Sequence, residues 1–270
     1  RGIVAIARCG HREVALRGRT EMYRTWALYK KEVRSYFVTP LFYVVAAVFL
    51  CLCGWLFYSD LNFFTQFGYG MDILGSFFQL LFVDIATKAM TFTVPLLTMR
   101  LFAEERKLGT IELLFTYPLR DGEIVAGKFL AAATVFLIML AGTLLYPLYL
   151  FSVQPFPFQL VTAGYSGLIL LGLVFIAVGL FVSSLTDSQV VAGVFSLFLV
   201  GVLWLMTWNE AAGTDQVMSV LKGYSTFDHF WNFSKGVIDS SDVLYYLLII
   251  SFFAILTLRS LESRRWRGRR

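Results

Sequence analysis

Three residues in one polar stretch have the types and the spacing of a nucleotide phosphate-binding loop. Gly122, Gly127 and Lys128 match the first part of the pattern G-x-x-x-x-G-K-[ST], in which backbone N–H groups and the lysine hold phosphates. The pattern then requires Ser or Thr as a magnesium ligand, and this chain has Phe129 there. The loop must also follow a strand, whereas this stretch leads into an apolar run. The sequence therefore predicts no ATP site here.

Other catalytic or metal-binding patterns are absent from the sequence. His11 and His229 are the only histidines, and neither H-E-x-x-H nor G-x-S-x-G occurs. The three cysteines, Cys9, Cys51 and Cys53, lack the number and spacing of a zinc site or a disulfide framework, so they are interpreted as packing thiols. We therefore predict no catalytic, cofactor-binding or metal-binding residue in this chain.

Asp84 and Lys88 are charged residues inside an apolar run. A charge at membrane depth costs about 2.5–3.5 kcal/mol on insertion scales, so such residues usually face a bundle interior or a cavity. Two interpretations stay open for this pair. It is either a contact on a transport path or a local i,i+4 ion pair that lowers the cost of insertion.

The composition is that of a membrane protein. Of the 270 residues, 58% are hydrophobic and 15% are charged, against about 45–50% and about 25% in soluble domains. The mean hydropathy is +0.70, and several runs approach the roughly 20 apolar residues that span a bilayer. We therefore predict an all-α polytopic protein in contact with the lipid bilayer. The net charge of +5 is interpreted as a topology signal, not as a sign of nucleic-acid binding.

Hydropathy predicts six transmembrane helices, at about 38–58, 79–102, 126–150, 165–185, 189–208 and 242–258. Lys and Arg gather before the first span, between the second and third, and after the sixth, whereas the first and third loops have none. Because Lys and Arg accumulate in cytoplasmic loops, both termini and the polar stretch after the second span are predicted to be cytoplasmic. Pro95 is expected to kink the second span.

The N-terminal region divides into two parts. Residues 1–21 are interpreted as a disordered tail or an over-called start, and the domain proper as 22–267, followed by a basic tail at 268–270. Within 22–37, five apolar residues recur at helical spacing: Met22, Trp26, Tyr29, Val33 and Phe37. This pattern indicates an amphipathic helix that lies in the inner membrane interface or packs on the protein itself. Thr39-Pro40 is expected to end it.

The polar stretch between the second and third spans predicts a short helix on the cytoplasmic side. Arg100 and Glu104 are four apart, so the second span can continue into water as a helix. Gly109 then interrupts it, and Thr110 is a candidate N-cap for a short apolar helix that ends at Tyr117-Pro118. Asp121 is expected to cap the third span. A short apolar helix in water needs a cover, which is either a partner protein or the protein's own spans.

The stretch "LLTMRLFAEERKLGTIELLFTYPLRDGEIVAGKF" resembles the signature region of ABC-2 type ABC transporter permeases. "SSLTDSQVVAGVFS" (183–196) resembles the turn and fifth span of that family. "HFWNFSKGVIDSSDVLYYL" (229–247), with "LESRRWR" (261–267), is similar to the gliding-motility and copper-maturation type branch. The resemblance covers about residues 22–267.

The resemblance implies a permease subunit without its own ATPase site. The segment after the second span would be a coupling helix that docks on a separate ABC ATPase subunit, which would hold the ATP and magnesium. The loop 186–189 would be a second cytoplasmic contact. A second permease copy or a close paralogue would complete a transporter in the inner membrane of a prokaryote. The residues that match the coupling motif are Glu104, Glu105, Arg106, Gly109, Thr110, Glu112, Leu113, Leu114, Pro118, Gly127 and Lys128.

Two other function classes stay open at this point. The chain could be a membrane scaffold that uses the same motor to act on an extracytoplasmic partner. A secondary transporter or membrane enzyme would place ionisable residues in several spans, whereas here Asp84 and Lys88 are the pair that qualifies. The fifth loop, 209–241, is rich in aromatic residues. It is interpreted as a belt seated on lipid, or as an outer gate or partner contact, with Ser241 capping the last span.

Overall fold

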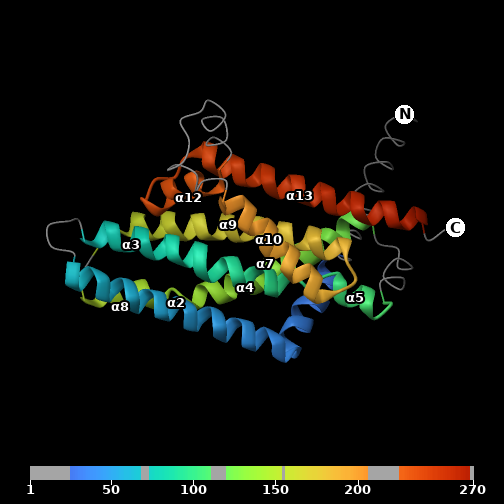
Figure 1. The fold of residues 1–270 in the computed structure, drawn as a ribbon, viewed down its shortest axis with the longest axis horizontal. Helices are drawn as coiled ribbons and strands as arrows, with labels where there is room; N and C mark the ends of the chain where they lie inside the picture. The colour runs from blue at the N-terminus through green and yellow to red at the C-terminus, as the bar shows by residue number, and fades with distance from the viewer. Residues whose placement is uncertain (1–24, 68–72, 111–119, 154–155, 206–224, 268–270) are drawn as a thin grey trace, which may run out of the picture.

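The computed structural model describes residues 25–67, 73–110, 120–153, 156–205 and 225–267. In these ranges the regular secondary structure is helical (Figure 1). A first helix covers residues 25–38. The others are α2 (Pro40–Phe67), α3 (Ile73–Asp84), the π-helix η1 (Ile85–Met90), α4 (Thr91–Thr98), α5 (Ala103–Lys107), α7 (Asp121–Gly142), α8 (Leu145–Val153), α9 (Phe158–Leu185), α10 (Gln189–Leu205), α12 (Thr226–Ser234) and α13 (Ser240–Arg267).

The all-α polytopic class is confirmed. Five helical segments are long and apolar enough to cross a membrane: Pro40–Gln66, Gly75–Lys107, Asp121–Val153, Phe158–Leu185 and Ser240–Ser263. The remaining predicted span corresponds to Gln189–Trp204, which is apolar but shorter than these five. The order of the elements thus follows the six predicted spans.

Several helices are longer than hydropathy predicted. The first span continues to Gln66, the third begins at Asp121, and the fourth begins at Phe158, whereas 58, 126 and 165 were expected. Hydropathy detects only the part of a helix that suits hydrocarbon. Backbone hydrogen bonds continue into the polar interface, because nothing in these sequences ends the helix there.

Helix α9 is the central element of the bundle. It packs against α13, α10, α4, α12 and α7, and it is the most buried of the five long segments. Its glycines permit this close packing. A Cβ at Gly172 would lie 2.3 Å from the Phe136 ring, and one at Gly179 would lie 1.9 Å from Thr98 Oγ1. Side chains at these two positions would force α7 and α4 away from α9.

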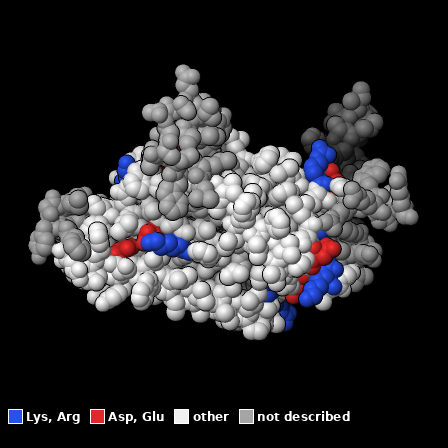
Figure 2. Space-filling model, viewed as in Figure 1, with Lys and Arg blue, Asp and Glu red and all other residues white. Residues whose placement is uncertain are grey.

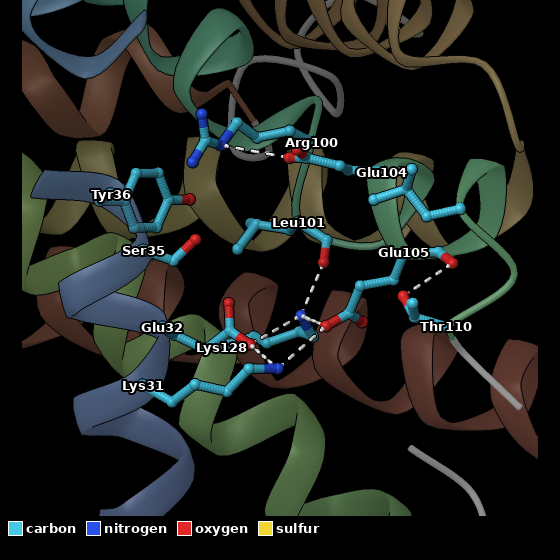
Figure 3. Close-up of a pocket in the computed structure, with 11 residues that line it drawn as sticks. Lys31, Glu32, Ser35, Tyr36, Arg100, Leu101, Glu104, Glu105, Thr110 and Lys128 are labelled. Atoms are coloured by element: carbon cyan, nitrogen blue, oxygen red, sulfur yellow. Dashed lines mark hydrogen bonds and ion pairs between the residues drawn. The ribbon is translucent and has the colours of Figure 1, made fainter. Parts of the chain in front are cut away.

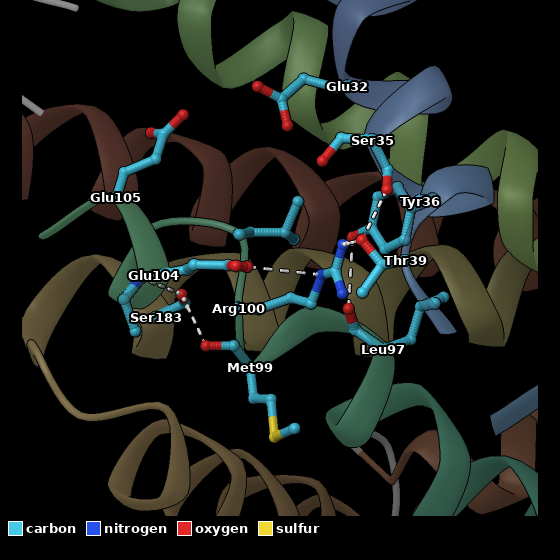
Figure 4. A network of polar contacts seen from close by, with 12 residues as sticks. Glu32, Ser35, Tyr36, Thr39, Leu97, Met99, Arg100, Glu104, Glu105 and Ser183 are labelled. Carbon is cyan, nitrogen blue, oxygen red and sulfur yellow. Dashed lines mark hydrogen bonds and ion pairs between the residues drawn. The ribbon is translucent and has the colours of Figure 1, made fainter. Parts of the chain in front are cut away.

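The second span is interrupted twice. The π-helix η1 precedes α4, which contains Pro95, and residues 99–102 then form a turn before α5. The second span thus continues past Arg100 and Glu104 to Lys107, as expected, but it contains a turn that the sequence did not predict. The reason lies in α9, whose Ser183 Oγ accepts hydrogen bonds from the N–H groups of Phe102 and Ala103, at 2.9 and 3.1 Å. This hydroxyl also donates to Met99 O (Figure 4), so it stabilises the break.

Asp84 and Lys88 form the local ion pair that was one of the two interpretations of their spacing. Lys88 Nζ donates to Asp84 Oδ2, and the lysine side chain remains 60% exposed while that of the aspartate is 11% exposed. Figure 2 shows a small group of charged atoms over the region of α3, surrounded by uncharged surface, and a larger group at the end of the molecule where α5 lies.

The fifth loop contains a helix, α12, two of whose aromatic side chains are buried. Phe230 and Phe233 are fully buried, and a Cβ at Gly167 of α9 would lie only 2.6 Å from Phe233 Cβ. In the described part of this loop, the expectation of an aromatic belt on lipid was thus wrong for these two residues. They are buried because α9 has a small residue where α12 packs.

Polar contacts hold α12 to α13. Asp242 is buried and accepts from Asn232 Nδ2 at 3.0 Å, and it contacts His229 Nδ1 at 2.5 Å. Helix α13 begins at Ser240, and Asp239 Oδ1 accepts from the Ser241 N–H at 3.2 Å. The cap is therefore Asp239, and the expectation that Ser241 caps this helix was wrong.

Candidate functional site: the junction of α5, α7 and the first helix

The first helix packs on the protein through a face that hydropathy did not single out. Leu28, Glu32 and Tyr36 recur every four residues and are all buried. Trp26, from the predicted aromatic stripe, is exposed, and contact of that stripe with lipid stays a prediction. The predicted break is confirmed, because the helix ends at residue 38 and α2 begins at Pro40.

Gly127 brings the first helix and α7 together. A Cβ at Gly127 would lie 3.1 Å from Leu28 Cδ2, closer than side chains normally approach. The Tyr29 hydroxyl also lies 3.0 Å from Thr134 Oγ1 of α7. Because Lys128 follows Gly127, this approach places the lysine beside Glu32, which is one turn after Leu28.

Lys128 is the buried centre of the junction. Its side chain is 1% exposed, and its Nζ lies 3.0 Å from Glu105 Oε1 and 3.2 Å from Glu32 Oε1. The same ammonium donates to Leu101 O at 2.8 Å, as Figure 3 shows. A buried ammonium is tolerated only when paired and hydrogen-bonded, and here it has three acceptors. The cluster of Glu32, Glu105 and Lys128, which we call the buried triad, connects the first helix, α5 and α7.

Lys31 adds an exposed cation to the buried triad. Its Nζ lies 3.7 Å from Glu32 Oε1 and 3.8 Å from Glu105 Oε1, and its side chain is 64% exposed. The two carboxylates are thus balanced by two ammonium groups. The exposed pairs contribute little to stability because water screens them, so Lys128 is the counter-ion that matters.

Arg100 forms a second connection between the first helix and the turn before α5. Its Nε lies 3.6 Å from Glu104 Oε2, and its Nη2 donates to Thr39 Oγ1 at 3.0 Å. The guanidinium also lies over the Tyr36 ring, 5.0 Å from its centroid (Figure 4). Burial raises the pKa of Tyr36 well above its ordinary value, so the hydroxyl stays protonated and donates to Leu97 O at 3.2 Å.

Gly109 ends α5 in the left-handed conformation, with φ at 69°. The Gly109 N–H donates to Arg106 O at 3.0 Å, and the Thr110 N–H donates to Glu105 O at 2.9 Å. These are the two hydrogen bonds of a Schellman motif. The Thr110 hydroxyl also donates to Glu105 O. In the described residues Thr110 therefore closes α5, and the N-cap predicted for it concerns residues 111–119, outside the described ranges.

Arg106 connects α5 to the loop between α9 and α10. Its side chain is nearly buried, and its Nη1 lies 3.5 Å from Asp187 Oδ1. The structure therefore places the two predicted cytoplasmic contacts, the segment after the second span and the loop 186–189, against one another.

Helix α7 begins with a cap other than the predicted one. The Arg120 N–H donates to Glu123 Oε2 at 2.9 Å, while Arg120 O accepts from the Glu123 N–H. Asp121 is the first residue of the helix, so the expectation that it is the cap was wrong. Arg120 takes the cap position because Glu123, three residues on, satisfies its N–H group.

A cavity of about 240 Å³ opens beside the buried triad. Its lining mixes the cations Lys31, Arg100 and Lys128 with the anions Glu32, Glu104 and Glu105 (Figure 3). Among the described residues, no group of three or more His, Cys, Asp or Glu side chains is placed to hold a metal. Lys128 faces two carboxylates in this arrangement, which opposes phosphate binding. The junction has the features of a mechanical connection between helices.

The sequence-predicted residues divide into three groups. The junction brings together Glu104, Glu105, Arg106, Gly109, Thr110, Gly127 and Lys128. Four more, Glu112, Leu113, Leu114 and Pro118, lie outside the described residues. Asp84 and Lys88 form their own pair in the second span.

Sequence reasoning missed two residues of the junction. Glu32 is an isolated acid among Lys30, Lys31 and Arg34, and this contrast was the available signal. The sequence contained no such signal for Ser183, because nothing in it connects this residue with the turn at 99–102.

The model of one protein family, described as ABC-2 family transporter protein, matches residues 26–259. The match begins in the first helix and ends in α13, so it covers the junction, four of the five long segments and most of the fifth. Comparison with curated proteins finds no match.

Proposed function

We propose, from the premise that this chain belongs to the ABC-2 family of transporter proteins, that it couples ATP hydrolysis in a separate ATPase subunit to movement of a substrate. The chain is a multi-pass membrane protein and a permease of an ABC transporter. Such permeases are normally the non-catalytic membrane subunit. The gliding-motility and copper-maturation type branch is the branch that we propose within the family.

The buried triad carries this proposal. Residues 111–119, which would dock on the ATPase, are joined to α5 on one side and to α7 on the other. Glu105 and Lys128 connect these two helices to each other and, through Glu32, to the first helix. A force applied to this segment would therefore reach three elements together. A permease that transmits motion from a motor needs such a connection.

Three further contacts extend the connection into the bundle. Arg106 pairs with Asp187 between α9 and α10, Ser183 of α9 holds the turn before α5, and Arg100 reaches Thr39 at the start of α2. When ATP binding brings two ATPase subunits together, the coupling segments of two permease copies would move with them. The bundle would then shift between two states with different access to the path.

The proposed topology predicts labelling from opposite sides. In a background without native cysteines, Thr110→Cys and Ser152→Cys should react with a membrane-impermeant maleimide from the cytoplasmic and the extracytoplasmic side, respectively. Both residues are exposed. Thr110 precedes the third span, and Ser152 lies near the end of α8, at the other end of that span. Labelling is measured in intact cells and in inverted vesicles. Reaction of both cysteines in intact cells would overturn the proposed cytoplasmic placement of the junction.

The proposed coupling is tested through Glu105. The chain is co-expressed and purified with its candidate ABC ATPase, and spin labels at Ser152→Cys in two copies report the distance between the outer ends. ATP should change this distance in the parent protein. Glu105→Gln should retain the ATPase and lose most of the change, because the carboxylate that joins α5 to Lys128 is removed. Lys107→Gln, an exposed position on the same helix, is the control. A distance that never responds to ATP in the parent complex would refute the proposed function.

A further inference from the structure

Lys88 is exposed at a depth where a membrane has no water. Twelve residues separate it from Arg100, which is about 18 Å along a helix at about 1.5 Å per residue. Arg100 belongs to the junction, and the hydrocarbon core is about 30 Å thick. The Lys88 backbone therefore lies inside the hydrocarbon, in the half away from the junction.

The ion pair with Asp84 uses only part of the hydrogen-bonding capacity of Lys88. An ammonium has three donors, and among the described residues Asp84 Oδ2 takes one of them. The side chain of Lys88 is 60% exposed, whereas that of Asp84 is 11% exposed. A molecule that approaches this face consequently meets the positive charge first. The carboxylate beside it holds the ammonium in place.

A second acid of the outer half lies close to the pair. Asp60 of α2 is 4% exposed and lies near enough to Asp84 and Lys88 to interact electrostatically with both. Its Oδ2 is buried without a hydrogen-bond partner in the described residues. Three ionisable groups from the first and second spans thus lie close together. The described parts of the other spans are apolar at this depth. Ionisable residues in a membrane usually mark a functional site.

The local backbone and the neighbouring side chains fit an amphiphile. Lys88 lies in the π-helix η1, a feature found frequently at functional sites. Phe92 and Leu96 follow at intervals of four residues, and both are exposed. This stripe of the second span is therefore charged at its outer end and apolar toward the junction. A lipid of the outer leaflet has the same polarity, with its headgroup outward and its chains inward.

We propose that Lys88, held by Asp84, binds an amphiphile with an anionic headgroup, whose chains lie along Phe92 and Leu96. The headgroup oxygens would take the remaining ammonium donors, and such charge-assisted hydrogen bonds are strong where water is excluded. The binding itself depends only on this face. Its position on the transport route rests on the proposed function, and it would make the substrate a lipid-like anion.

The test measures lipid binding to the purified chain without its ATPase. Phosphatidylglycerol and phosphatidylcholine are titrated separately into the protein in neutral detergent, and bound lipid is counted by native mass spectrometry. Phosphatidylglycerol should bind about tenfold or more tightly than phosphatidylcholine, because both lipids have a phosphate but the choline cation of phosphatidylcholine is repelled by the Lys88 ammonium where water is excluded. Glycerol 1-phosphate, a phosphorylated glycerol without acyl chains, should bind far more weakly than the lipid.

Four variants separate binding from folding. Lys88→Gln should remove the preference for phosphatidylglycerol, but it leaves Asp84 without its counter-ion. The double variant Asp84→Asn with Lys88→Gln removes both charges of the pair from the second span. It should therefore fold at least as well as the parent and still lack the preference for phosphatidylglycerol. Lys88→Arg retains the positive charge and should keep the preference for phosphatidylglycerol. Lys235→Gln, at an exposed lysine beside Trp231, should change nothing.

Three results would overturn the proposal. A double variant that still prefers phosphatidylglycerol would show that the pair only lowers the cost of insertion. Equal binding of glycerol 1-phosphate and the lipid would show that the chains play no part. In a Lys88→Cys variant, formation of a disulfide between two copies to the same extent with and without phosphatidylglycerol would show that this face lies at the interface between two copies and does not bind the lipid. None of these assays contains the ATPase, so failure of the proposed coupling would be seen separately in the spin-label distances.

Discussion

Replacement of Lys128 by methionine should destabilise the protein by about 3–5 kcal/mol, the range for removing one partner of a buried ion pair. Methionine fills a similar volume but leaves Glu32 and Glu105 buried side by side without their main counter-ion. Lys31 remains near both carboxylates, but at 64% exposure it offsets little of the loss. The measurement is thermal unfolding of the purified chain in detergent, with the yield of monodisperse protein as a second readout.

Two comparisons show whether charge is the cause. Lys107→Met removes an exposed lysine from the same region and should unfold like the parent. A triple variant, Lys128→Met with Glu32→Gln and Glu105→Gln, removes the whole buried triad and should recover much of the stability, since a buried ion pair can often be replaced by neutral groups. If Lys128→Met unfolds no earlier than Lys107→Met, the triad does not hold the three helices together.

Leu113→Asp and Leu114→Asp should each break association with the ATPase while the membrane fold stays intact. Burial of one leucine side chain is worth about 1.5–3 kcal/mol, and a few central contacts carry most of the energy of an interface. A charge placed there also loses its hydration, so a reduction of about a hundredfold or more in affinity is expected. Co-purification of the two subunits measures the effect, with detergent-stable yield as the folding control.

The matched control lies at the other end of the bundle. Val237, between α12 and α13, is an exposed apolar residue, and Val237→Asp should leave ATPase binding unchanged. Glu112→Ala should be milder than either leucine variant if its charge lies at a solvated rim. Full ATPase binding by both leucine variants would mean that the segment packs on its own spans. The assignment of residues 111–119 as a coupling helix would then be wrong.

The described contacts explain why this segment would transmit motion. Residues 111–119 are held at one side by the Gly109 turn and at the other by the Arg120–Glu123 cap of α7. The first attachment ends the helix that contains Glu105, and the second begins the helix that contains Lys128. We therefore expect motion of the proposed coupling segment to reach the buried triad through both helices.

The sequence by itself determined the class of the protein and the order of its elements. Hydropathy and the charge distribution placed the spans, because both are summed over about twenty residues and do not depend on packing. The coupling motif identified the family region, and the family match agrees. The spacing of Asp84 and Lys88 made an ion pair one of two interpretations, because residues four apart in a helix share a face, and the structure contains that ion pair.

Only the tertiary structure decided which residues meet across helices. Glu32 and Lys128 are far apart in the chain, and they pair because Gly127 lets α7 approach Leu28. Ser183 determines where the second span breaks, because its hydroxyl accepts the N–H groups freed at Phe102 and Ala103. Local patterns did not predict the turn at 99–102, and they made Asp121 the cap of α7 where the structure has Arg120. Periodicity predicts which face of a helix is buried, but a hydrogen bond between distant residues depends on how closely two backbones approach, and here that was decided by the packing of α7 and α9.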